Sequence, residues 1–101
     1  MDKLDTSTAA SLLANLPHWQ HDQQRGAITR EFRFHDFIEA FAFMTQLAIV
    51  AEKRDHHPEW SNVYNKVVIT MTTHDAGGLT RKDTDFAACA DQAFVRFAGL
   101  N

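Results

Sequence analysis

The sequence predicts an α+β domain in which a four-stranded antiparallel sheet has three helices packed on one face. Two turn signals, Arg25-Gly26 and Asn65-Lys66, each lie between two β-type runs and indicate two hairpins. Apolar residues recur at helical spacing before, between and after these hairpins. The predicted order is helix, strand, strand, helix, strand, strand, helix, in a single domain covering residues 1–101.

The N-terminal segment predicts a short helix followed by the first hairpin. Ser7 or Thr8 is expected to cap the helix, which should end at Pro17. The apolar stripe of this helix consists of Ala10, Leu12, Leu13 and Leu16. Residues 19–24 and 27–34 are then expected to be strands. On one face of the second strand lie Ile28, Phe32 and Phe34.

A long helix is predicted from Asp36 to about Arg54, because Asp36 and Glu39 have the spacing of a capping box. It carries two apolar stripes. The first stripe consists of Phe37, Phe41, Met44, Ala48 and Ala51, and the second of Phe43, Leu47 and Val50. In a chain this small, one stripe is expected to contact another subunit. The alternative is that the helix is buried on both sides within one subunit.

Residues 63–74 predict the second hairpin, which Gly77-Gly78 terminates. Val67, Ile69 and Met71 alternate with more polar residues, as in a strand packed on one face. Thr80 and Asp83 form a second capping signature after Leu79. The last helix should bury Phe86, Ala87, Ala90, Phe94 and Phe97. An exposed sheet edge would be a second route to self-association.

Composition excludes several functional classes. The formal net charge of −3 disfavours direct binding to nucleic acid or to an anionic membrane. Cys89 is the single cysteine, so neither an intrachain disulfide nor a cysteine-rich zinc site is expected. No segment approaches the ~20 apolar residues of a membrane-spanning helix, and no secretory signal is expected. We therefore expect a cytoplasmic protein.

Two adjacent histidines, His56 and His57, follow the long helix within the segment EKRDHHPEWSNVY. Pro58 favours an extended conformation at His57, so the two imidazoles should point in different directions. His74 lies at the predicted end of a strand. Helix ends and strand ends are where a site at the rim of the sheet would form.

Spacing alone leaves three interpretations of these histidines open. Proton transfer is one, because an unperturbed imidazole titrates near neutral pH, with a pKa of about 6.5. A metal site is disfavoured, because adjacent histidines have neither helix-face spacing nor the two-residue spacing of a strand. The third is that they are solvated surface residues, as expected for the isolated His18, His21 and His35.

The segment EKRDHHPEWSNVYNKVVITMTTH, followed by Gly78-Leu79-Thr80 and Asp83, resembles the pterin-4a-carbinolamine dehydratase family. The resemblance extends upstream through FRFHDF and AFAFMT and covers about residues 19–97. These proteins are also dimerisation cofactors of a homeodomain transcription factor. The resemblance implies the same sheet and helices, with homodimers formed through sheet edges and some homotetramers formed through the long helix.

The resemblance also implies a reaction, the dehydration of 4a-hydroxytetrahydrobiopterin to quinonoid dihydropterin. This reaction recycles the pterin cofactor of aromatic amino acid hydroxylases such as phenylalanine hydroxylase. Hydroxide is a poor leaving group, so an acid must protonate the C4a oxygen while a base accepts the N5 proton. The pterin is the substrate of this reaction. Because the loss of water changes no overall oxidation state, neither a metal nor another cofactor is expected.

The family's three active-site histidines match His56, His57 and His74. We expect His56 and His74 to alternate as acid and base, and His57 mainly to hold the pterin. Glu52 is expected to join the catalytic set by orienting an imidazole, the alternative being a solvated carboxylate at a helix end. The further positions expected to contact the pterin are Asp55, Pro58, Trp60, Thr72, Thr73 and Asp75, although Trp60 could equally anchor the core.

The main alternative function is a non-enzymatic module that stabilises the dimer of a protein partner through the Phe43, Leu47 and Val50 stripe. The complete set of three histidines favours the enzyme. Ala76-Gly77-Gly78 and Lys82 differ from the corresponding residues of animal members. Both departures concern the rim of the pocket and leave the preferred pterin side chain open.

Overall fold

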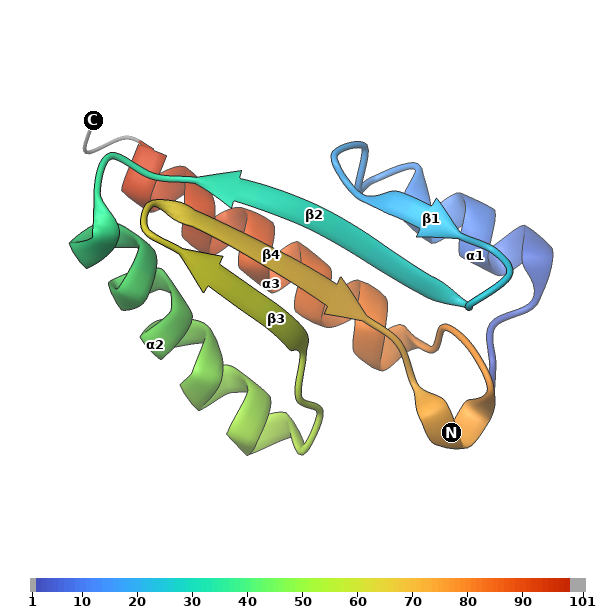
Figure 1. The fold of residues 1–101 in the computed structure, drawn as a ribbon. Coiled ribbons are helices and arrows are strands. Elements are labelled where there is room, and N and C mark those ends of the chain that lie inside the picture. Colours follow the sequence, from blue (N-terminus) through green and yellow to red (C-terminus); the bar gives the residue numbers. More distant parts are fainter. Residues whose placement is uncertain (1, 99–101) are drawn as a thin grey trace.

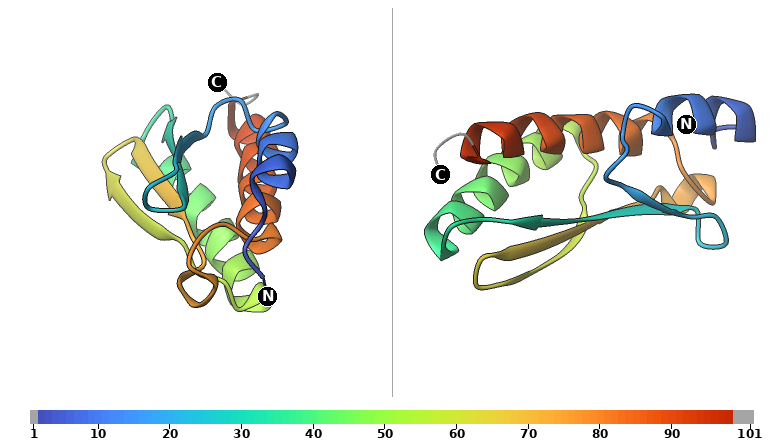
Figure 2. Two further views of the ribbon diagram at one scale, coloured as in Figure 1. Left: turned by 90° about the vertical axis from the view of Figure 1, so that its right-hand side faces the viewer. Right: turned by 90° about the horizontal axis from the view of Figure 1, so that it is seen from above.

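A computed structural model describes residues 2–98 and confirms the predicted α+β architecture and element order. The helices are α1 (Thr6–Leu13), α2 (Phe37–Arg54) and α3 (Arg81–Ala98), and a short 3₁₀ helix, η1, spans His74–Ala76. The antiparallel sheet consists of β1 (Gln20–Asp22), β2 (Ala27–Arg33), β3 (Glu59–Val63) and β4 (Lys66–Met71), in the order β1-β2-β4-β3. Figures 1 and 2 show the helices on one side of this sheet.

The core fills the space between the helices and one face of the sheet. Phe32 of β2 lies at its centre, with its ring centroid 4.9 Å from that of Phe43 and 5.2 Å from that of Phe94. The alternation predicted for β4 is confirmed, because Val67, Ile69 and Met71 are fully buried. No helix among residues 2–98 is long and apolar enough to cross a membrane.

Both hairpins form, with boundaries that differ from the prediction. The first strand is shorter than residues 19–24, because Trp19 packs into the core instead of pairing. In the second hairpin Val63 pairs with Lys66, so the turn is Tyr64-Asn65 and not Asn65-Lys66. Tyr64 has a left-handed backbone, with a φ of 52°. The preceding strand begins at Glu59, earlier than predicted.

The two apolar stripes of α2 lie on adjacent sides of the helix, and the first is divided, because Phe37 and Phe41 are exposed whereas Ala51 is buried. Phe43 and Leu47 of the second stripe are fully buried, which contradicts the prediction that this stripe is free to bind a protein partner. The stripe is occupied because it faces the sheet and α3 within the same chain. The opposite face exposes Phe37, Ile38, Phe41 and Ile49, which we call the α2 patch.

The cap of α1 also differs from the prediction. Asp5, rather than Ser7 or Thr8, caps the helix, and its Oδ1 accepts a hydrogen bond from the Thr8 N–H at 2.7 Å. The helix begins at Thr6, so Ser7 and Thr8 already lie inside its first turn. The stripe is shifted as well, because Ala9 is buried and Ala10 is exposed.

The predicted cap of α2 is confirmed. Asp36 Oδ1 accepts from the Glu39 N–H at 2.9 Å, and Glu39 Oε1 accepts from the His35 N–H at 3.0 Å. An Asp36→Ala substitution should lower the free energy of unfolding by about 1 kcal/mol, because it removes the partner of an otherwise unpaired N–H. Urea denaturation measures this change. Asp36→Asn is the matched control, since asparagine caps equally well; equal stability of Asp36→Ala and the wild type would contradict the prediction.

Candidate active site

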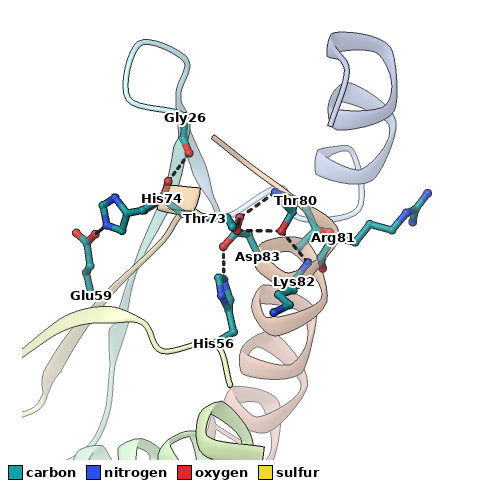
Figure 3. A network of polar contacts seen from close by, with 11 residues as sticks. Gly26, His56, Glu59, Thr73, His74, Thr80, Arg81, Lys82 and Asp83 are labelled. Carbon is teal, nitrogen blue, oxygen red and sulfur yellow. Dashed lines mark hydrogen bonds and ion pairs between the residues drawn. The ribbon is translucent and has the colours of Figure 1, made fainter. Parts of the chain in front are cut away.

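The end of α2 determines where the adjacent histidines lie. Asp55 adopts a left-handed conformation, with a φ of 51°, and its N–H bonds to carbonyl oxygens of the last helical turn. The next N–H, that of His56, donates to the Ala51 carbonyl oxygen at 3.0 Å. This closure of the helix turns the chain out of the helical path, and His56 reaches the N-terminal end of α3 (Figure 3).

His56 contacts a fully buried carboxylate. Its Nε2 lies 2.5 Å from Oδ1 of Asp83, which is 0% exposed. Asp83 Oδ2 accepts from the Thr80 N–H at 2.9 Å and from the Thr73 hydroxyl at 2.8 Å. An ionised carboxylate can only accept, so beside one Nε2 of His56 donates, and in the neutral imidazole Nδ1 is then the nitrogen without a proton. Because both carboxylate oxygens are engaged, the imidazole is held in one orientation and one tautomer.

His57 contacts Glu52 on the surface. Its Nε2 lies 2.8 Å from Glu52 Oε1, and the two side chains are 57% and 82% exposed. The structure therefore brings Glu52 to His57, and not to His56 or His74. A contact this exposed orients an imidazole weakly, because water competes for both partners.

His74 lies on η1, immediately beyond β4, and is also exposed. Its Nε2 is 3.3 Å from Glu59 Oε2, and Figure 3 shows the ring directed toward Glu59 rather than toward His56. The other oxygen of Glu59 lies 2.5 Å from Arg25 Nη2. The hydrogen bond from Arg25 is the main reason that the pKa of Glu59 is lowered from its usual value.

The remaining predicted pterin contacts differ in their surroundings. Thr72 donates its hydroxyl to the Gly26 carbonyl oxygen at 2.8 Å, while Asp55 and Asp75 are exposed. Trp60 pairs with Ile69 across the β3–β4 ladder and packs against the core, which favours an anchoring role. Pro58 is half-buried directly before β3.

A cavity of about 410 Å³ lies elsewhere, between the N-terminal segment, the β1–β2 turn and Gly77-Gly78. None of the predicted site residues lines it. His57 and His74 are exposed, whereas the side chain of His56 is only 11% exposed. Among residues 2–98, no group of three or more His, Cys, Asp or Glu side chains is placed to hold a metal ion.

Comparison with known proteins identifies the family. Residues 2–93 match the family described as pterin 4 alpha carbinolamine dehydratase. The chain belongs to this family.

Several relatives of this dehydratase family resemble the chain over most of its length. A candidate pterin-4-alpha-carbinolamine dehydratase of Rhizorhabdus wittichii is 54% identical over 87 residues, covering 86% of this chain and 90% of the relative. A Bradyrhizobium protein named in the same way is 46% identical, covering 98% of this chain and 99% of the relative.

Solved structures agree with the observed fold. The crystal structure of a transcriptional coactivator/pterin dehydratase from Brucella melitensis superposes with a TM-score of 0.88 at 44% identity, covering 92% of this chain and 99% of that chain. A pterin dehydratase-like RuBisCO assembly factor of the α-carboxysome shares the fold, with a TM-score of 0.66 at 24% identity, over 74% of this chain and 87% of its own.

In this member of the dehydratase family, sequence reasoning identified Asp83 only as a helix cap. The cap is confirmed, because Asp83 accepts from the Thr80 N–H, but that bond uses a single carboxylate oxygen. The other oxygen faces His56. A usable signal was an aspartate in the first turn of a helix that closely follows His74, since one carboxylate can serve both the helix and a nearby imidazole.

Proposed function

We propose that this protein is a 4a-hydroxytetrahydropterin dehydratase, which releases water from pterin-4a-carbinolamine to give quinonoid dihydropterin. The observation that carries the proposal is the contact of His56 with the buried Asp83, in a chain that belongs to the dehydratase family. A histidine whose tautomer is fixed by a carboxylate, and whose second nitrogen is left to exchange a proton, has the properties required of a general acid or base.

The proposed reaction needs two proton transfers. One imidazole accepts the proton from N5 as the C4a–O bond breaks, and a second imidazolium donates a proton so that the oxygen leaves as water. His56 and His74 alternate in these roles, while His57 binds the pterin beside Glu52. Protons balance across the pair and no electrons leave the substrate, so the step requires neither an electron acceptor nor a metal.

This reaction would return the pterin of an aromatic amino acid hydroxylase, such as phenylalanine hydroxylase, to a form that a reductase can use. We place it in the cytoplasm. The test is stopped-flow decay of chemically generated 4a-hydroxytetrahydropterin with and without the purified protein. Acceleration proportional to protein concentration supports the dehydratase. A folded wild-type protein that does not accelerate the decay would overturn it in favour of a protein-binding module.

We also propose that the α2 patch contacts a second copy of the chain, giving a homodimer or homotetramer. Ile38, Phe41 and Ile49 are 76%, 55% and 54% exposed in the single chain, and contiguous exposed apolar side chains mark interaction surfaces. They share one helix face, opposite the core. A second copy would cover them with the same face of its own helix, as in a two-fold interface.

A Phe41→Glu substitution should therefore lower the molar mass of the protein measured by light scattering, because it buries a carboxylate in the interface. Val95→Glu on α3 is the matched control, since Val95 is 67% exposed but lies outside the patch. Equal masses for Phe41→Glu and the wild type would contradict self-association through the patch. A monomeric wild type would assign the patch to a different protein partner.

A further inference from the structure

Arg25 and Glu59 form an ion pair beside His74 that the proton transfers described above do not use. One oxygen of Glu59 lies 2.5 Å from Arg25 Nη2, and the other lies 3.3 Å from His74 Nε2. A single carboxylate thus connects a guanidinium to an imidazole. The three residues come from the β1–β2 turn, the first position of β3 and η1, so the contact joins three segments that are distant in sequence.

The surrounding backbone holds Arg25 in place. Asp22 Oδ1 accepts from the Arg25 N–H at 3.1 Å, and the Asp22 carbonyl oxygen accepts from the Gly26 N–H at 2.8 Å. Gly26 adopts a φ of 68°, which closes the turn. The Gly26 carbonyl oxygen in turn accepts from the Thr72 hydroxyl, two residues before His74. The turn that carries Arg25 is therefore fixed to the segment that carries His74.

Stability does not account for this arrangement. The side chains of Arg25 and Glu59 are 46% and 45% exposed, and ion pairs this exposed contribute little to folding because water screens them. An exposed pair can still act on a neighbouring imidazole, since it determines the net charge a few ångströms from the ring.

We propose that Glu59 and Arg25 are positioning residues for His74, with Glu59 holding the Nε2–H of the imidazole and Arg25 offsetting the charge of Glu59. The catalytic part of this proposal rests on the proposed function, in which His74 transfers a proton. The charge arrangement itself can be tested without turnover.

The expected consequences follow from charge. The pKa of Glu59 is lowered, chiefly by the hydrogen bond from Arg25, so Glu59 is ionised at neutral pH and can only accept from Nε2. Without Arg25, the charge of Glu59 is no longer offset and imidazolium at His74 is favoured. Without the charge of Glu59, neutral imidazole is favoured. The other charged groups in these segments, Asp22 and Asp75, are the same in every variant that changes Arg25 or Glu59.

The experiment is an NMR titration of the His74 imidazole in the wild type and in Arg25→Gln, Glu59→Gln and Arg25→Lys. The titration midpoint of His74 should rise in Arg25→Gln and fall in Glu59→Gln. Each change should be about 0.2–0.7 pH units, because exposed charge pairs have interaction free energies in the corresponding range. Arg25→Lys retains the positive charge and should stay close to the wild type. Two variants that break the same ion pair are thus expected to shift in opposite directions, which a purely structural role would not produce.

Midpoints that do not move, or that move in the same direction in both glutamine variants, would overturn the proposal. If the wild type accelerates carbinolamine decay, the pH profile of kcat should shift with the NMR midpoint. A profile that stays fixed while the midpoint moves would overturn the catalytic part. If the wild type does not accelerate the decay, only the dehydratase proposal fails. The NMR titration still decides whether Arg25 and Glu59 control the protonation of His74.

Discussion

A variant carrying both His56→Ala and His74→Ala is expected to lose the acceleration of carbinolamine dehydration given by the wild-type protein. Each proton transfer contributes about 10²–10⁴-fold to the rate, so the double variant should approach the uncatalysed decay. Stopped-flow absorbance measures the decay. His74→Ala should leave the fold intact, because His74 is exposed. His56→Ala leaves Oδ1 of the buried Asp83 without its partner, so urea denaturation of each variant must show that it is folded at the assay temperature.

The matched control is His18→Ala, which removes an exposed histidine outside the site and should leave kcat unchanged. Each single variant should lose activity, because each lacks one partner of the acid–base pair. Wild-type rates in either single variant would remove that histidine from the mechanism. Equal loss in His18→Ala would show that the effect is not specific to the site.

Substitution of Asp83 should separate its two roles. Asp83→Ala leaves the buried Thr80 N–H and the Thr73 hydroxyl without their acceptor, so the free energy of unfolding should fall by about 1–3 kcal/mol. Asp83→Asn retains an oxygen for the Thr80 N–H. Its amide would donate to His56 Nε2 and favour the opposite tautomer. We expect Asp83→Asn to keep most of the stability and to lower kcat by about 100-fold or more.

Urea denaturation and stopped-flow decay on the same preparations test this expectation. Asp85→Asn, at an exposed position in the same helical turn, is the control and should change neither stability nor kcat. Wild-type kcat in Asp83→Asn would show that the tautomer of His56 is not set by this carboxylate. A fully stable Asp83→Ala would show that the cap contributes nothing.

Most of the secondary structure could be predicted because its signals are local. The alternation through Val67, Ile69 and Met71 and the pairing of Asp36 with Glu39 depend on neighbours within a few residues. The inward face of α2 could not be predicted in this way, since both stripes are apolar and the choice depends on the sheet that the helix meets. The turn at Tyr64-Asn65 is likewise set by the register of two strands.

Some residues of the candidate site could be predicted from the sequence and others could not. The set of histidines was predicted from a resemblance, but the carboxylates that hold two of them were not. Asp83 is 27 residues from His56, and Glu59 is 15 residues from His74. Such separations carry no periodic signal, and only the folded chain brings these groups together. The exposed partner of His57, Glu52, is close in sequence and was predicted as a site residue.

The double use of Asp83 has a consequence for interpreting related sequences. One carboxylate both caps α3 and holds His56, so a descendant that no longer performs the reaction would still be selected to keep the aspartate for its stability. Retention of this residue is therefore a poor marker of activity across relatives. The exposed His57 and His74, which the fold does not require, would be among the first positions to drift once catalysis is lost.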